Sequence, residues 1–92
     1  MDPEALAIRA LGFISRDRRA LDRVLSRSGR ERLDLGRRPI DAELLVASLD
    51  FLIRHEPMLL AFSSTISQPP EATYHARRRI GRSMLRRSDL PA

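Results

Sequence analysis

The sequence predicts an all-α fold, a compact bundle of four to six short helices around a central apolar helix at about 42–55. Apolar residues recur with helical spacing in several segments, and Pro, Gly, Asp and Ser residues separate these segments. Aromatic residues are scarce, with three Phe, one Tyr and no Trp, so the core must consist mostly of aliphatic side chains. The 92 residues suffice for one domain, expected over 1–88 with a frayed tail at 89–92.

The first segment begins with residues that are typical of a helix start. Asp2 can cap free backbone N–H groups, and Pro3 is favourable in a first turn. The apolar stripe then stays in phase far along the chain, so a single helix over 3–27 is one interpretation. A break at residues 15–17 is the other, because Asp17 would lie on the apolar face of a continuous helix but can cap a second one. Gly29 is expected to end this segment in a left-handed conformation.

The centre of the chain carries the clearest helical pattern. A connector over 30–40 has room for one helical turn, with Leu33 and Leu35 as its expected anchors. Asp41 is then the expected N-cap of the central helix, about 42–55, whose apolar stripe is unusually wide. Six residues of this region and the next helix are expected to be the most buried: Leu45, Leu49, Leu52, Ile53, Leu59 and Phe62.

Proline residues divide the second half of the chain. Pro57 ends the central helix and suits the first turn of the next one, expected over 57–66 and paired with it as an antiparallel hairpin. A last helix begins at about residue 70. It either stops at Gly81 or continues to about residue 87, and the apolar phase favours continuation.

Positive charge is concentrated in two segments. All seventeen basic residues are arginine, and the formal net charge is +5. Residues 16–38 contain nine arginines and 76–92 contain six, whereas 39–75 contain one arginine and five acidic residues. Such asymmetry is typical of a nucleic-acid surface, but it also fits charge pairing within the chain or between subunits.

One apolar run reads LDFLIRHEPMLLAF, from Leu49 to Phe62. It resembles the signature of a small, chiefly alphaproteobacterial family designated domain of unknown function 3572. The segment PPEA at 69–72, followed by AR at 76–77, is similar to the closing helix of that family, and the segment 5–14 is similar to its opening helix. The resemblance covers about residues 4–80. It implies a compact helical cytoplasmic protein with no established activity and supplies no catalytic residues.

The sequence favours a small non-catalytic interaction module that acts by self-association or by docking on another protein. The small size and the wide apolar face over 42–66 support this interpretation, with a homodimer or a protein complex as the expected state. The candidate interface residues are Phe51, Met58 and Phe62.

Non-specific nucleic-acid binding through the segments 16–38 and 76–92 is the alternative, because the phosphate backbone rewards clustered arginines without reading sequence. Only Tyr74 is a stacking platform near the basic residues, which argues against recognition of single strands. The candidate contacts are Arg18, Arg19, Arg78, Arg79, Arg82 and Arg86.

No enzyme activity, cofactor or metal site is expected. The chain has no cysteine and two histidines, and the pair Glu71 and His75 provides two ligands where a metal site needs three or four. No glycine-rich phosphate loop and no activated nucleophile are recognisable. No apolar run is long enough to span a bilayer, and the N-terminal segment is acidic rather than leader-like. We therefore expect a cytoplasmic protein that does not contact membranes.

Overall fold

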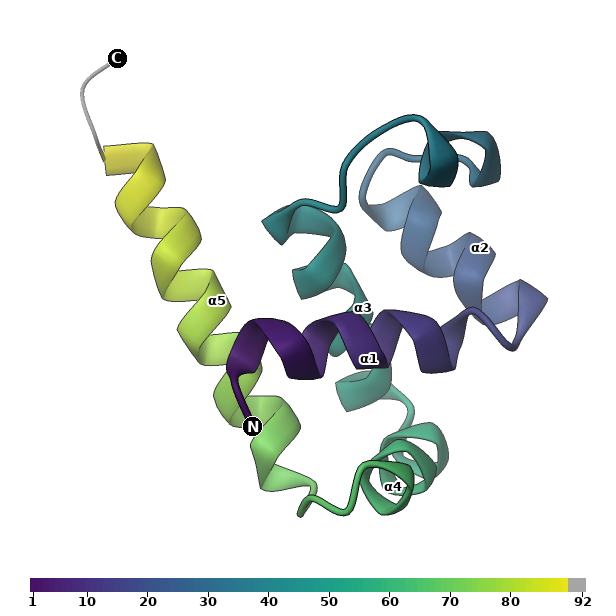
Figure 1. Cartoon of the computed structure of the whole chain (residues 1–92), viewed down its shortest axis with the longest axis vertical. Helices are drawn as coiled ribbons and strands as arrows, with labels where there is room; N and C mark the ends of the chain where they lie inside the picture. The colour runs from purple at the N-terminus through teal and green to yellow at the C-terminus, as the bar shows by residue number, and fades with distance from the viewer. Residues whose placement is uncertain (90–92) are drawn as a thin grey trace.

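In the described part of the chain, five α-helices and one short 3-10 helix follow one another (Figure 1). The computed structural model describes residues 1–89, with side chains described through residue 84. Its elements are α1 (Pro3–Ile14), α2 (Arg18–Arg27), η1 (Arg32–Gly36), α3 (Ala42–Arg54), α4 (Glu56–Thr65) and α5 (Glu71–Asp89). The described residues contain no strand, so the all-α prediction is confirmed. The predicted frayed tail lies outside the described residues, except for the backbone of Asp89, which ends α5.

The first segment forms two helices, and a carboxylate explains the break. Oδ1 of Asp17 accepts hydrogen bonds from the backbone N–H groups of Arg19 and Ala20, at 3.0 and 3.2 Å, and so caps α2. Gly29 follows α2 with φ +70°, as its sequence position predicts. The N–H of Arg30 then donates to the carbonyl of Leu25 at 2.7 Å. This bond is the Schellman arrangement, which folds residue 30 back over the end of α2.

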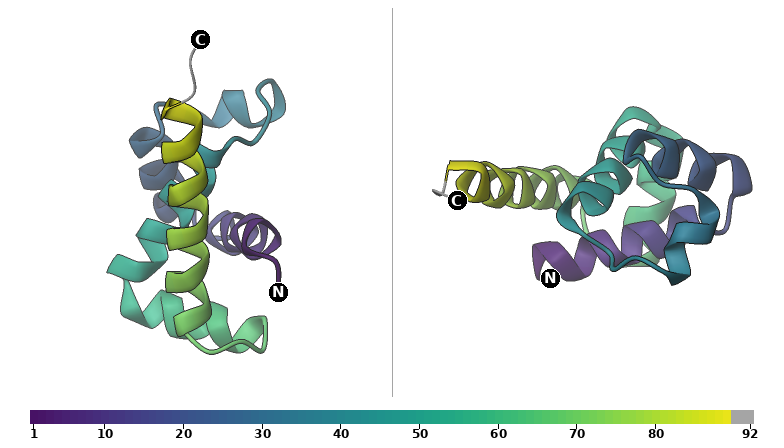
Figure 2. Two further views of the ribbon diagram at one scale, coloured as in Figure 1. Left: turned by 90° about the vertical axis from the view of Figure 1, so that its left-hand side faces the viewer. Right: turned by 90° about the horizontal axis from the view of Figure 1, so that it is seen from above.

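The central helix α3 contacts α1, α2 and α5, and α2 and α5 lie on opposite sides of it (Figures 1 and 2). Leu49 and Leu52 of α3 are completely buried. Ser48 is buried too, but its hydroxyl donates to the carbonyl of Leu44 at 2.9 Å and is therefore satisfied. Five of the six residues expected to be most buried are in the core; the sixth, Ile53, is only half-buried, so that expectation is wrong. Ile53 lies at the edge of the stripe, where α3 approaches its end.

The predicted antiparallel hairpin is wrong. Only His55 separates α3 from α4, and this single residue is too short to reverse the chain. Instead α4 lies across the end of α3 and is seen nearly end-on in Figure 1. The ring of Phe62 on α4 packs against Phe13 of α1, with the centroids 5.6 Å apart. This packing ties α4 to α1.

The connector between α2 and α3 contains the expected helical turn, η1, but it is anchored differently from the prediction. Leu33 is 69% exposed, so it is no anchor, whereas Leu35 is partly buried and packs against the core. The N–H of Glu31 donates to the carboxylate of Asp34 at 2.9 Å, and this local contact defines the tight turn. The turn directs Leu33 outward.

The last helix continues through Gly81, as the apolar phase favours. Nε of Arg77 donates to Oδ1 of Asp50 at 2.7 Å and so joins α5 to α3. A Cβ atom at position 81 would lie 2.6 Å from Nη1 of Arg77, so the glycine leaves room for this guanidinium. The last turns of α5 extend beyond the other helices (Figure 2).

Candidate functional site

A groove of about 520 Å³ separates α5 from the N-terminal ends of α1 and α3. Both α1 and α3 pack on α5, which brings their capped ends to the same side of the molecule. We call this hollow the α1–α3–α5 groove. It is lined by Asp2, Pro3, Glu4, Ile40, Asp41, Ala42, Leu45, Arg79, Ile80 and Ser83.

Opposite charges line the two sides of this groove. Asp2 and Glu4 belong to the start of α1, and Arg79 belongs to α5; all three are exposed. Oδ2 of Asp2 accepts the N–H of Ala5 at 3.1 Å as the cap of α1. None of these three residues forms an ion pair with another described residue. Their charges are therefore unpaired within the described residues.

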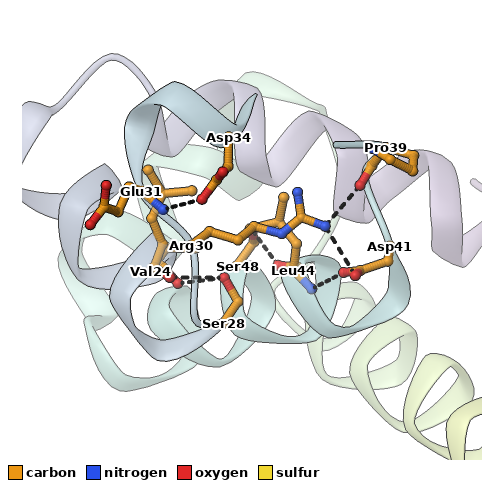
Figure 3. Close-up of polar contacts among 10 residues, drawn as sticks. Val24, Ser28, Arg30, Glu31, Asp34, Pro39, Asp41, Leu44 and Ser48 are labelled. Atoms are coloured by element: carbon orange, nitrogen blue, oxygen red, sulfur yellow. Dashed lines mark hydrogen bonds and ion pairs between the residues drawn. The ribbon is translucent and has the colours of Figure 1, made fainter. Parts of the chain in front are cut away.

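The third acidic residue of the groove, Asp41, forms an ion pair with the buried side chain of Arg30 (Figure 3). The side chain of Arg30 is 1% exposed, and its Nη2 lies 3.0 Å from Oδ2 of Asp41 and 2.8 Å from the carbonyl oxygen of Pro39. Nε and Nη1 of Arg30 are buried without a hydrogen-bond partner. Arg30 thus fixes the end of the connector against α3, but two of its donor groups are unsatisfied.

The same contacts lower the pKa of Asp41 below its ordinary value of 3.8. Partial burial raises this pKa, but the hydrogen bond from the N–H of Leu44, at 3.0 Å, and the Arg30 guanidinium outweigh that effect. The folded state therefore favours the charged carboxylate.

We expect the Asp41→Asn variant to show how much this charge stabilises the fold. An asparagine oxygen can still cap Leu44, so the variant removes mainly the charge beside Arg30. Because the pKa of Asp41 is lower in the folded state, its stabilising effect is complete above the ordinary value of 3.8 and disappears as the pH falls through the lowered value. Urea unfolding at about pH 7 should show a loss of under about 1 kcal/mol, since the carboxylate is partly exposed, and at about pH 3 a smaller loss.

Glu43→Gln is the matched control, because it removes an exposed charge from the same turn of α3 without breaking a hydrogen bond or ion pair. An equal loss for Asp41→Asn at both pH values would contradict the role given to the charge.

Comparison with known proteins assigns the chain to a family. The profile of DUF3572, described as a protein of unknown function, matches residues 1–82. The protein belongs to this family. The resemblance seen in the sequence is thereby confirmed. No curated protein and no solved structure matches the chain.

In this DUF3572 member the predicted nucleic-acid contacts lie in two separate places. Arg18 and Arg19 are exposed at the start of α2, and Arg78, Arg79 and Arg82 are exposed on α5. Because α2 and α5 lie on opposite sides of α3, the fold does not merge the two groups into one surface (Figures 1 and 2). Arg86 belongs to α5, but its side chain lies outside the described residues.

The three predicted interface residues differ in their accessibility. Phe62 is 1% exposed and belongs to the core, so it is not available to a partner. Met58 is half-buried and packs against the core. Phe51 is mostly buried, but it lines a second surface hollow, between α2 and the end of α3.

The sequence interpretation missed both the groove and the burial of Arg30. The groove unites three segments that are distant along the chain, so no local pattern indicates it. Arg30 did leave a signal, because it directly follows the glycine that ends α2, at a position whose side chain commonly folds back onto the helix. Counting it among surface charges was therefore an error.

The helices of the described region include none that is both long and apolar enough to cross a membrane. In the same region no three His, Asp or Glu side chains are grouped as metal ligands would be.

Proposed function

We propose that this protein is a non-catalytic interaction module that acts by self-association through the α1–α3–α5 groove. One observation carries the proposal: Arg79 lines the same groove as Asp2 and Glu4, yet these opposite charges form no ion pair within the described chain. A surface that carries both signs of charge on facing sides is complementary to a second copy of itself.

A dimer with a two-fold axis between its subunits pairs the opposite charges of the groove. In a symmetric dimer the same patch serves on both subunits, so Arg79 of each copy meets Asp2 and Glu4 of the other. The extending end of α5 provides a helix that can enter the groove of the second copy (Figure 2). Ile40 lines the groove and is 47% exposed, so it offers apolar surface to a second copy, whereas Ile80 in the wall is buried. Burial of this apolar surface supplies affinity, while the charges determine the orientation.

Sedimentation equilibrium tests this proposal. We expect a reversible dimer for the natural chain, and for Arg79→Glu a dissociation constant raised at least about tenfold, because the variant places like charges across the interface. Arg78→Glu is the matched control: it makes the same charge change one residue away, on an exposed position that does not line the groove. Its dissociation constant should stay near that of the natural chain.

A charge exchange makes the test specific. Adding Glu4→Arg to Arg79→Glu restores opposite charges across the two-fold axis, so the double variant should dimerise more tightly than either single variant. Circular dichroism monitors folding, since an arginine in the first turn of α1 costs a few tenths of a kcal/mol. A natural chain that stays monomeric at hundreds of micromolar, or equal weakening by the Arg78 and Arg79 changes, would contradict self-association through this groove.

Nucleic-acid binding is the second candidate function, and α5 is the element that favours it. Arg78, Arg79 and Arg82 are exposed within two turns of this helix and form no ion pair with described residues. If they contact phosphates, the logarithm of duplex affinity should fall with log salt at about 0.9 per phosphate neutralised. Arg78→Glu then weakens gel-shift binding to random duplex DNA but leaves the dimer intact. If the natural chain shifts neither duplex DNA nor structured RNA at low salt, this candidate is excluded.

A further inference from the structure

A second hollow, of about 500 Å³, lies between α2 and the end of α3. We call it the α2–α3 hollow. Arg23 and Arg27 border it from α2, where their spacing of four residues places them on one helix face. Arg54 borders it from the last turn of α3. Its other lining residues are Asp22, Ser26, Phe51 and His55.

The aromatic rings of Phe51 and His55 contact one another in the lining of this hollow. They stack with centroids 4.1 Å apart and an interplanar angle of 20°. Nδ1 of His55 also lies 2.8 Å from the carbonyl oxygen of Phe51. Since a carbonyl only accepts, Nδ1 carries the proton, and this bond fixes the ring against the end of α3. Phe51 is buried and His55 is half-buried, so the His55 ring is the part of this pair that a ligand can contact beside the charged groups.

The charge of the hollow is strongly positive. Arg23, Arg27 and Arg54 are exposed, and none of them forms an ion pair with a described residue. Asp22 is the one acidic residue in the lining, and both of its carboxylate oxygens accept from Arg32, at 2.7 and 2.6 Å. These hydrogen bonds also lower the pKa of Asp22, so its carboxylate stays ionised. It is paired with Arg32 and not with the three arginines that line the hollow. Three guanidinium groups are thus left without a counter-charge.

We infer that the α2–α3 hollow binds an acidic segment of a partner protein. Carboxylates of the segment pair with Arg23, Arg27 and Arg54, whose planar guanidinium groups donate two parallel hydrogen bonds to a carboxylate. One apolar side chain of the segment packs on the half-buried ring of His55. This site lies at the C-terminal end of α3, whereas the α1–α3–α5 groove lies at its N-terminal end, and it does not depend on self-association.

The shape of the site favours a peptide over a nucleic acid. A volume of this size holds a few side chains, as in small ligand pockets. Binding of a single strand relies on exposed aromatic faces that stack on bases, but Phe51 is only 5% exposed and its ring is covered by His55. The three arginines of the hollow come from two helices, Arg23 and Arg27 from α2 and Arg54 from α3.

Fluorescence anisotropy with a labelled peptide tests the inference. The probe contains four glutamates around one leucine, and two control peptides replace either the glutamates by glutamines or the leucine by serine. We expect the natural chain to bind the acidic probe and each control peptide to bind at least about tenfold more weakly. Arg27→Gln and Arg54→Gln should each weaken binding of the probe by about tenfold, since each removes one charge-assisted contact.

Arg37→Gln is the matched control variant, because it removes an exposed arginine outside the hollow. It should leave the affinity for the probe unchanged, and so should Arg79→Glu, which separates this site from the groove. No binding of the probe to the natural chain would overturn the inference. So would an equal loss in Arg37→Gln and Arg27→Gln, or tighter binding of a single-stranded oligonucleotide of equal charge that depends on Arg27.

Discussion

Leu49→Ala is expected to lower the free energy of unfolding by about 2–5 kcal/mol. Leu49 is completely buried in the middle of α3, the helix on which α1, α2 and α5 pack. The alanine leaves a cavity there, and three neighbouring helices cannot all move to fill it. Because a domain of this size is stabilised by only about 5–15 kcal/mol, the variant should be partly unfolded under mild heating. Urea unfolding at a fixed protein concentration measures the loss.

Leu60→Ala is the control for this experiment. Leu60 lies on α4 and is 49% exposed, so the same truncation opens no cavity and should change the stability little. Equal losses in the two variants would contradict the assignment of α3 as the centre of the core.

Replacement of Arg30 is expected to have the second largest effect. Arg30→Ala removes a buried side chain, the hydrogen bond to the carbonyl of Pro39 and the ion pair with Asp41, and should cost about 2–3 kcal/mol. Arg30→Met fills much of the same space and removes the two donor groups that have no partner, Nε and Nη1. We therefore expect Arg30→Met to lose less than half as much stability as Arg30→Ala.

Arg32→Ala is the control for the loss of an ion pair. It breaks the exposed pair with Asp22 and should change the free energy of unfolding little. If Arg30→Met is as unstable as Arg30→Ala, the polar contacts of Arg30 rather than its volume stabilise the connector. No loss in Arg30→Ala would show that the buried guanidinium contributes nothing to the fold.

Helix boundaries were the most predictable part of this structure because local chemistry determines them. Asp2, Asp17 and Asp41 cap α1, α2 and α3 through contacts within three residues, and such contacts are visible in the sequence. The phase of the apolar residues likewise indicated that α5 continues past Gly81. The crossing of α3 and α4 was harder to predict from the sequence, because it depends on a link of one residue and on the contact between Phe13 and Phe62.

Charge counted along the chain was a poor guide to the surface. The basic segment 16–38 includes Arg30, which is buried, and Arg32, which is paired with Asp22. On α5, Arg77 is paired with Asp50 of α3. Pairing between basic segments and the acidic middle, one of the alternatives that the sequence left open, thus accounts for Arg30 and Arg77. The groove and the α2–α3 hollow were not predicted because each unites residues from separate helices.

The contacts of Arg30 also bear on the entropy of ligand binding. By joining the end of α2 to Pro39 and Asp41, Arg30 closes the connector into a short loop, which restricts the motion of α2 relative to α3. These are the two helices that border the α2–α3 hollow. A ligand that enters it finds the helices already in place and has to order only the arginine side chains, at a cost of about 0.5–1.5 kcal/mol for each.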